Sequence, residues 1–295
     1  MYERLTNCPL CKSGHFLNQI VVKDHAHTQE SFTVCRCTNC ELWFTNPRPT
    51  LSEISKYYDK ETYISHKNKS NTLINFLYKQ VRKLTIRKKL NWLKERNKIP
   101  GRLLDFGCGT GHFLYSAKQK GWMVTGVEPN NDARKIATSE HQLTVYESLD
   151  EIKKEKKYDA ITLFHVLEHV HDLKGTIRSL LELLKKRGSL YIAVPNRDSP
   201  DFQHYKENWA ALDVPRHLYH FNRQSMKFLA EKYSLKIIEE KPMLFDSFYV
   251  SLLSDKYQPI KSSFVASIAK GLKFNKAAAK NQSNYSSILF ILKKK

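Results

Sequence analysis

Four of the six cysteines form two closely spaced pairs near the amino terminus, and their spacing predicts a metal site. Cys8 and Cys11 form one C-x-x-C pair, and Cys37 and Cys40 form the other. Two residues between cysteines let both thiolates of a tight turn reach one ion, and two such turns complete a tetrahedral site. Four soft thiolates favour zinc in a closed, structural site. We therefore expect a small zinc-binding lobe, with Cys35 left over.

Two other interpretations of the cysteines are disulfide bonds and a redox pair. The start of the chain, Met1 to Arg4, lacks the apolar run of a signal peptide, so we expect a cytoplasmic protein, in which disulfides are rare. No βαβ pattern surrounds either pair, which argues against a redox motif. The weaker alternatives for one metal ligand are His15, His25 and His27.

A glycine-rich turn follows an apolar segment that begins at residue 102. It carries three glycines at alternate positions, Gly107, Gly109 and Gly111. A helix is expected over 112–120 and a strand over 123–127. Such a turn lets a ligand approach the backbone and the amino terminus of the helix. The G-x-G-x-G spacing matches neither the dinucleotide fingerprint nor a Walker A loop.

Two carboxylates flank this turn and narrow the chemistry of the ligand. Glu128 ends the second strand, where an acid can accept both hydroxyls of a ribose. Asp105 directly precedes the turn, where it would repel a pyrophosphate but suits a ligand that carries an ammonium group. The pattern therefore predicts an adenosine-like ligand with a positive charge.

Four motifs in this order resemble those of the class I S-adenosylmethionine-dependent methyltransferases. They are Leu-Leu-Asp-Phe-Gly-Cys-Gly-Thr-Gly at 103–111, Val-Thr-Gly-Val-Glu-Pro at 124–129, the segment Tyr158–His169 and the segment Gly188–Asn196. The resemblance covers roughly residues 100–240. It implies an α/β fold with a Rossmann-like seven-stranded sheet and helices on both faces, preceded here by the zinc-ribbon-like lobe.

The resemblance also implies roles for individual residues toward S-adenosylmethionine. Asp105 would contact the methionine amine and Glu128 the ribose. Backbone near Gly107 and Gly109 would line the methionine part, and Gly111 would belong to the same cofactor-binding turn. The segment Glu147-Ser148-Leu149 would flank the adenine, and His165 would face the methionine end.

A histidine-rich segment at 165–169 reads His-Val-Leu-Glu-His and matches the H-x-x-E-H pattern of inverted zinc peptidases. It ends a strand-like run rather than lying within a long helix, and no third ligand stands at a suggestive spacing, so we do not expect a peptidase. A similar E-x-x-E-H segment binds magnesium in quinone-pathway O-methyltransferases. Because His165 stands at the first position here, we do not expect a metal at this point.

The segment Asp198–Phe221 is longer than a typical connection and is dense in aromatic and titratable side chains. Long loops over the carboxyl ends of strands commonly carry substrate contacts. Histidine suits proton removal because its pKa lies near neutrality. The base candidates are His165 and His217, followed by His169. Arg216 would hold an anionic acceptor.

Aromatic residues of this segment have two interpretations. They form either a stacking platform for a base or sugar or ordinary packing against the sheet: Tyr205, Trp209 and Tyr219.

Periodicity and turn residues divide the chain into three segments. We expect a zinc-binding lobe over 1–49, a helical linker or lid over 50–99, and the methyltransferase domain over 100–295 with an insertion at about 244–285. The elements expected outside the glycine turn are helices over 71–97 and 173–187, a helix beginning near Asn222, and strands over 158–166, 189–194, 235–239 and 288–292. Gly188 is expected to end the helix at 187.

The charge of the chain is uneven. It has 295 residues, 49 Lys or Arg and 29 Asp or Glu, a formal net charge of +20. Residues 67–98 hold eleven Lys or Arg and one acid, and residues 256–295 hold nine Lys and no acid. Such segments indicate an anionic partner or, equally, a solvated face. No apolar run is long enough for a membrane span, but peripheral association with an anionic membrane is a possible use of this charge.

Three functional hypotheses follow. The layout of the cysteine lobe through Asn46-Pro47-Arg48-Pro49 resembles the sugar C-methyltransferases of deoxysugar and antibiotic pathways, so the first is methyl transfer to a small-molecule, sugar or lipid-linked acceptor. The second is an rRNA or tRNA methyltransferase that uses the lobe and the basic helix to bind RNA. Against it, the fourth strand ends in Leu-Phe-His-Val rather than in the signature of base-amine methylases. The third is a binding protein without catalysis, which the retained carboxylates and glycines oppose.

Overall fold

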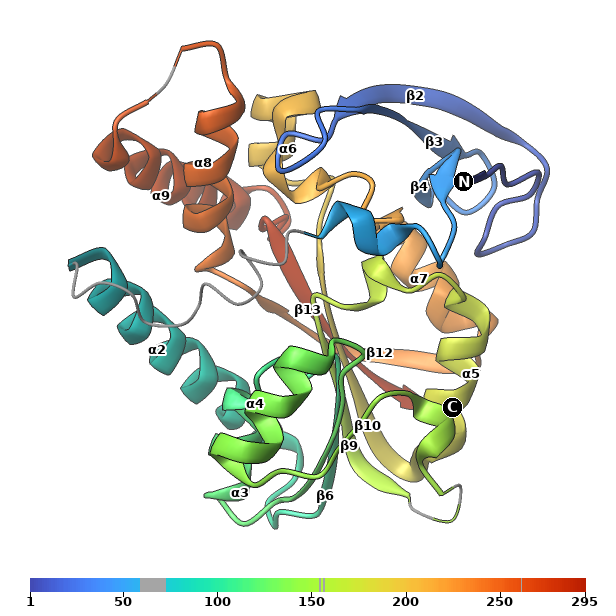
Figure 1. Cartoon of the computed structure of the whole chain (residues 1–295), viewed down its shortest axis with the longest axis vertical. Coiled ribbons are helices and arrows are strands. Elements are labelled where there is room, and N and C mark those ends of the chain that lie inside the picture. Colours follow the sequence, from blue (N-terminus) through green and yellow to red (C-terminus); the bar gives the residue numbers. More distant parts are fainter. Residues whose placement is uncertain (59–72, 154, 156, 261) are drawn as a thin grey trace. The chain divides into compact units, whose positions relative to one another are not determined.

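The computed structural model describes residues 1–58, 73–153, 155, 157–260 and 262–295, with side chains from residue 80 onward in the first long helix (Figure 1). The amino-terminal elements are β1 (Tyr2–Glu3), β2 (Phe16–Lys23), β3 (Ser31–Cys37), β4 (Trp43–Thr45), β5 (Arg48–Pro49) and the 3-10 helix η1 (Ile54–Tyr57). The middle elements are α2 (Leu73–Arg96), β6 (Arg102–Phe106), α3 (His112–Lys118), β7 (Met123–Val127), α4 (Asn131–His141), β8 (Val145–Tyr146), η2 (Leu149–Glu151), β9 (Tyr158–Phe164), η3 (Leu167–His169), α5 (Leu173–Leu183) and β10 (Leu184–Pro195). The remaining elements are α6 (Pro200–Tyr205), η4 (Lys206–Asn208), η5 (Ala210–Leu212), β11 (Tyr219–His220), α7 (Arg223–Lys232), β12 (Leu235–Pro242), α8 (Asp246–Tyr257), α9 (Phe264–Lys280) and β13 (Ser287–Lys294).

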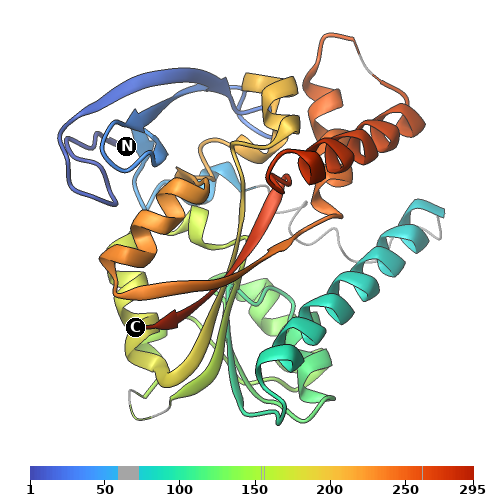
Figure 2. The ribbon, with the colours of Figure 1, turned by 180° about the vertical axis from the view of Figure 1, so that it is seen from behind.

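The main sheet has seven strands in the order β12-β13-β10-β9-β6-β7-β8. Strand β6 pairs in parallel with both β7 and β9, and β7 pairs in parallel with β8. Helices α3 and α4 lie on one side of these strands and α5 lies on the other (Figures 1 and 2). The expected seven-stranded Rossmann-like sheet with helices on both faces is confirmed.

One expected boundary is wrong. Helix α5 ends at Leu183 rather than at 187, and strand β10 already begins at Leu184. Gly188 lies inside β10 and does not cap the helix. A Cβ atom at Gly188 would lie 2.7 Å from Leu184 Cδ1 and 3.0 Å from the carbonyl oxygen of Tyr158. Glycine is therefore needed at this position because a side chain would collide with Leu184 and Tyr158. In the sequence, a glycine needed for close packing cannot be told from a glycine that ends a helix.

A second sheet contains the amino-terminal strands. Its order is β11-β4-β3-β2, all antiparallel, and a separate two-stranded sheet pairs β1 with β5. Strand β11 comes from the acceptor-side segment: Tyr219 pairs with Phe44, and His220 pairs with Trp43. The cysteine lobe thus shares a sheet with a segment more than 170 residues later in the chain.

The described chain divides into two compact units, each discontinuous in sequence. The first comprises Met1–Asp59, His165–Lys174 and Ala193–Phe290. The second comprises Lys60–Phe164, Gly175–Ile192 and Ile291–Lys295. The predicted segment boundaries at 49 and 99 stay a prediction, and helices α8 and α9 fill the predicted insertion.

The first unit has an apolar core to which lobe and later segments both contribute. Its fully buried or nearly buried members include Phe32, Val34, Trp43, Trp209 and Leu212. Because apolar burial contributes about 25 cal/mol per Å², this common core stabilises the lobe against the segment that carries β11.

Candidate functional site

The glycine turn between β6 and α3 has the backbone conformation that its sequence predicts. The values of φ are 76° at Gly107, 55° at Gly109 and 81° at Gly111, in the left-handed region that favours glycine. A Cβ atom at Gly111 would also lie 2.6 Å from Leu143 Cδ1. At Gly109 a Cβ atom would meet nothing within 4 Å, so this backbone is open for the approach of a ligand.

Glu128 is buried at the end of β7, and its carboxylate is anchored by backbone donors. The N–H of Gly109 donates to Glu128 Oε2 at 2.8 Å, and the N–H of Asn130 donates to Oε1 at 2.9 Å. Each carboxylate oxygen can accept more than one hydrogen bond. The side chain is therefore fixed in orientation while it keeps acceptor capacity for hydroxyls.

Asp105 is a buried carboxyl group at the end of β6. The hydroxyl of Thr162, on the neighbouring strand β9, donates to Asp105 Oδ1 at 2.6 Å. Burial raises the pKa of Asp105 to about 7, an effect that the Thr162 hydrogen bond and Lys89 only partly offset. An added ammonium group beside this carboxyl would favour its ionised form.

The predicted adenine-flanking residues follow β8. The carboxylate of Glu151 accepts the backbone N–H groups of Glu147 at 3.1 Å and Ser148 at 3.0 Å. Arg134 on α4 binds Glu147 at 2.7 Å. These bonds order the turn that carries Ser148 and Leu149, and their contact with adenine stays a prediction. Asp105, Glu128, the three glycines and this turn all belong to the second unit.

The predicted histidines belong to the first unit. His165 follows β9 directly, with φ of 59°, and its ring lies between two carboxylates. Its Nε2 is 2.9 Å from Asp246 Oδ2, and its Nδ1 is 3.5 Å from Glu168 Oε1. Burial lowers the pKa of His165, but the charge and hydrogen bond of Asp246, with Glu168, raise it to about 10. At neutral pH this ring carries a proton, so in this arrangement it does not accept another.

His169 and His217 have a different arrangement. The Nδ1 atom of His169 lies 3.0 Å from the carbonyl oxygen of Arg216, and that of His217 lies 2.8 Å from the carbonyl oxygen of Ala211. A carbonyl oxygen only accepts, so in both rings Nδ1 carries the hydrogen and the neutral ring has Nε2 as a proton acceptor. Burial and the neighbouring His217 lower the pKa of His169 to about 4. The ring centroids are 4.6 Å apart.

Glu168 lies between these histidines with its side chain fully buried. Both its oxygens lack a hydrogen-bond donor among the described residues, although Nδ1 of His165 lies at ion-pair distance. Burial raises the pKa of Glu168, but the combined effect of the three histidines around it is larger and brings the pKa below its ordinary value. The carboxyl group is therefore ionised. One ligand atom each of Glu168, His169 and His217 lies within 4.8 Å of the others. The carboxylate of Glu168 raises the pKa of His169, but burial and the neighbouring His217 outweigh this effect.

The expected role of Arg216 is wrong. Its guanidinium donates to both oxygens of Asp213 at 3.0 and 3.1 Å, to Asp24 at 2.9 Å and to the carbonyl oxygen of Tyr57 at 2.9 Å. The side chain is buried, and its donors are used within the protein. Arg216 therefore holds the loop that carries His217 to the lobe instead of an anionic acceptor.

The aromatic residues of the same segment pack in the interior and do not form a stacking platform. Trp209 is 2% exposed, and its Nε1 donates to Asp201 at 2.9 Å. The hydroxyl of Tyr205 donates to Asp255, and that of Tyr219 donates to the carbonyl oxygen of His171.

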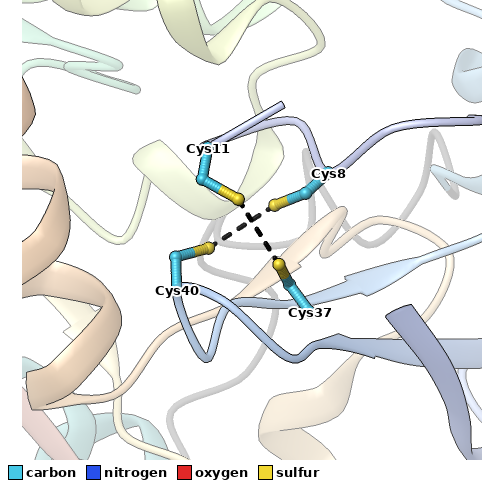
Figure 3. A group of neighbouring side chains, drawn as sticks. All are labelled: Cys8, Cys11, Cys37 and Cys40. Carbon is cyan, nitrogen blue, oxygen red and sulfur yellow. Dashed lines mark hydrogen bonds between the residues drawn. The ribbon is translucent and has the colours of Figure 1, made fainter. Parts of the chain in front are cut away.

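The four predicted cysteine ligands converge on one point (Figure 3). The sulfur atoms of Cys8 and Cys40 are 3.5 Å apart and those of Cys11 and Cys37 are 3.4 Å apart, and all four lie within 4.8 Å of one another. Four sulfurs bound to one zinc ion at about 2.3 Å lie roughly 3.8 Å from each other. The residues therefore fit a tetrahedral zinc site.

Both C-x-x-C turns have the same backbone pattern. The N–H of Cys8 donates to Ser13, and the N–H of Lys12 donates to Cys8. Cys37 donates to Leu42 and Glu41 donates to Cys37 in the same way. Lys12 and Glu41, each four residues after the first cysteine, have φ of 70° and 60°. The sequence did not indicate these left-handed positions, because neither is glycine.

Cys35 lies outside this cluster, as predicted. Its sulfur donates to Asn18 Oδ1 at 3.3 Å, and burial raises the pKa of its thiol.

Comparison with known proteins agrees with the fold and the glycine turn. The family described as a methyltransferase domain matches residues 78–240, just over half of the chain. A ubiquinone biosynthesis O-methyltransferase of Pseudomonas aeruginosa strain LESB58 is 31% identical over 121 residues, which are 37% of this chain and 51% of that protein. The enzyme of the same name from Marinobacter nauticus is 29% identical over 125 residues, 39% of this chain and 52% of that protein. The chain thus spans about half the length of these curated relatives.

Among solved structures, the magnesium protoporphyrin IX methyltransferase of Synechocystis PCC 6803 with bound S-adenosylhomocysteine is similar in fold. The TM-score is 0.54 at 15% identity, and the match covers 82% of this chain and 99% of that chain.

The sheet order, the glycine turn and the acids Asp105 and Glu128 are those expected of the class I S-adenosylmethionine-dependent methyltransferase fold. The chain belongs to the methyltransferase domain family that matches residues 78–240.

Sequence reasoning missed three groups at these sites. Asp246 is 81 residues from His165 in sequence, and Thr162 lies within an apolar strand, so neither carries a local signal. Glu168 stood in the H-x-x-E-H match but was not assigned a role of its own.

Proposed function

We propose that the protein transfers a methyl group from S-adenosylmethionine to a small-molecule acceptor, sugar or lipid-linked acceptors included. His169 and His217 are the base candidates for the proton that the acceptor loses. The observation that carries this proposal is the pair of imidazoles, His217 buried and His169 half-buried, whose Nδ1–H groups are held by carbonyl oxygens beside the ionised Glu168.

The chemistry of the bound cofactor sets the tasks of the protein. S-adenosylmethionine supplies a methyl group on a positively charged sulfur, which is transferred by in-line displacement. Asp105 and Glu128 would hold its ammonium group and ribose hydroxyls and so fix its orientation, a large part of such catalysis. An imidazole with an unprotonated Nε2 would take a proton from the acceptor, and the carboxylate of Glu168 would stabilise the imidazolium that forms, as would Asp213 Oδ2, 4.0 Å from Nε2 of His217.

His165 has a different role in this proposal. Its two carboxylate partners keep it protonated, so it would act as a hydrogen-bond donor and a fixed positive charge rather than as the base. The ubiquinone-pathway names of the curated relatives support a small organic acceptor over a nucleic acid.

We propose structural zinc at the four cysteines. Strand β4 of this lobe pairs with β11, and Thr45 binds the carbonyl oxygen of His217 at 2.9 Å and that of Leu218 at 3.0 Å. The ion would stabilise the sheet that positions the loop of His217, while closed four-sulfur coordination leaves it no open position for catalysis.

The test of the base assignment replaces each ring separately, as His169→Gln and His217→Gln. Loss of a positioned base lowers turnover by about 10²–10⁴-fold. Labelled methyl transfer from S-adenosylmethionine into a fractionated cell extract gives the rate, and calorimetry gives cofactor affinity. We expect one variant to lose turnover at unchanged cofactor affinity, while the matched control, His204→Gln on the exposed side of α6, keeps both. Full activity in both base variants would overturn the assignment.

A further inference from the structure

Helix α9 presents apolar side chains on the face that points to solvent. Val265 is 75% exposed and Leu272 is 49% exposed. Val265, Ala269, Leu272 and Lys276 follow one another at intervals of three or four residues, so their side chains lie along one face of the helix. Ile260, in the turn that precedes the helix, is 85% exposed. Together, these helix residues and Ile260 form the outer face of α9.

The opposite face packs against the protein and is made mostly of small residues. Its buried members are Ser267, Gly271, Phe274 and Ala278. A Cβ atom at Gly271 would lie 2.8 Å from Phe248 of α8, and Ser247 of α8 donates to the carbonyl oxygen of Gly271 at 2.9 Å. The two helices lie side by side at close range (Figures 1 and 2). The branched apolar residues of the outer face are therefore not needed for this packing.

The charge around the outer face has one sign. Residues 256–280, from the end of α8 through α9, carry six lysines and no acid. Lys270 is paired with Asp255 at 2.6 Å. The exposed lysines on α9 are Lys273, Lys276 and Lys280. A helix with exposed apolar residues flanked by lysines has the composition of an interfacial helix, which buries its apolar row at the level of lipid headgroups and binds anionic lipids by its charge.

The positive charge and the exposed aliphatic side chains of the outer face together distinguish between three binding partners: nucleic acid, a second copy of the chain and an anionic bilayer. Nucleic acid would bind the lysines, but single strands are held by the stacking of successive bases on aromatic rings. The row from Val265 to Leu272 is aliphatic, and Phe264, 47% exposed, lies only at the start of the helix. A second copy of the chain would bring the same positive segment to a symmetric interface, which repels. An anionic bilayer uses both the positive charge and the apolar row. Among the described helices, none is long and apolar enough to cross a membrane.

We propose that the α8–α9 hairpin docks on the surface of an anionic lipid bilayer, with Ile260, Val265 and Leu272 in the headgroup region. Lys273, Lys276 and Lys280 contact lipid phosphates. This inference does not depend on the identity of the methyl acceptor.

The test is co-sedimentation of the full chain with vesicles of phosphatidylcholine alone and with vesicles that contain about 30% phosphatidylglycerol. Two variants separate the two contributions. Lys273→Gln, Lys276→Gln and Lys280→Gln together remove three charges, and at about fivefold per lysine near the surface the triple variant binds about 100-fold more weakly. Val265→Ser with Leu272→Ser keeps the charge and removes apolar burial, with an expected loss of about tenfold.

A matched control removes three exposed lysines of the same unit that lie on other elements, as Lys174→Gln, Lys227→Gln and Lys236→Gln. The expected result is binding only to the anionic vesicles, a loss in both hairpin variants and parent-like binding of the control. Three results would overturn the proposal: no binding of the parent, an equal loss in the control, or parent-like binding of the Val265→Ser, Leu272→Ser variant. The last would show a purely electrostatic association, as with RNA. Circular dichroism checks that each variant keeps its helix content.

Discussion

The buried carboxyl of Asp105 leads to a prediction in which stability and cofactor binding change in opposite directions. Its pKa of about 7 lies about 3 units above the ordinary value of 3.8, because burial disfavours the charged form. A group whose pKa is raised in the folded state destabilises the fold above its unfolded pKa. The cost reaches about 4 kcal/mol at pH 8 and falls to about 2 kcal/mol at pH 5.

Asp105→Asn removes this cost and keeps an acceptor for the Thr162 hydroxyl. The new amide N–H groups need partners, and leaving them without any costs about 1–3 kcal/mol. We therefore expect the variant without cofactor to be about 1–3 kcal/mol more stable than the parent at pH 8 and within about 1 kcal/mol of it at pH 5. Urea unfolding at both pH values measures the difference.

Cofactor affinity should fall in the same variant. Loss of a hydrogen bond to a charged group costs about 1.5–3 kcal/mol, so the dissociation constant for S-adenosylmethionine rises about 10–150-fold by calorimetry. The parent should also bind more weakly as the pH falls below 7, because Asp105 takes up a proton, whereas the variant should not.

The matched control is Asp159→Asn on the neighbouring strand β9. Burial raises the pKa of Asp159, but the Arg102 N–H and Lys185 together have the larger effect and bring the pKa below its ordinary value. This carboxylate therefore stabilises the fold. The control should lose about 1 kcal/mol of stability and keep cofactor affinity. A less stable Asp105→Asn protein with parent affinity would refute the reasoning.

Three further predictions test other parts of the structure. Metal analysis should find about one zinc ion per chain in the parent and in Cys35→Ser, but little in Cys37→Ser, and equal zinc in both variants would contradict the four-cysteine site. Gly111→Ala combines left-handed strain with overpacking and should cost about 2–5 kcal/mol in urea unfolding; a cost below about 0.5 kcal/mol would show that the turn can relax. Asp246→Asn should bring the pKa of His165 down from about 10 in an NMR titration, and the stability that the raised pKa supplies below pH 6.5, lost as pH rises through 10, should shrink. An unchanged pKa would mean that Asp246 is not its partner.

The cofactor side of the fold was predictable from sequence because its determinants are local. The turn glycines and the acids that flank them stand within one β-turn-α-strand unit, where backbone conformation and spacing decide the ligand chemistry. The two cysteine pairs are also local signals, and the structure brings all four sulfurs together.

The acceptor side was predicted less well because its interactions are distant in sequence. Arg216 looked like an anion-binding residue, but its partner Asp24 is 192 residues away and belongs to the lobe. The sequence favoured His165 as a base, but Asp246 of the helical insertion lies beside its ring and keeps it protonated. Hydrogen-bond partners decide whether a polar residue is available to a substrate, and such partners have no fixed spacing in sequence.

The central claim is methyl transfer from S-adenosylmethionine to a small-molecule acceptor. Its most direct test supplies purified protein with methyl-labelled S-adenosylmethionine, near the dissociation constant of the parent, and a fractionated cell extract. The label is followed with Asp105→Asn as the reference that binds the cofactor weakly. We predict that label enters an RNase-resistant sugar, lipid or small-molecule fraction and that the variant transfers little. Label in an RNase-sensitive fraction would contradict the proposed acceptor class and point to RNA.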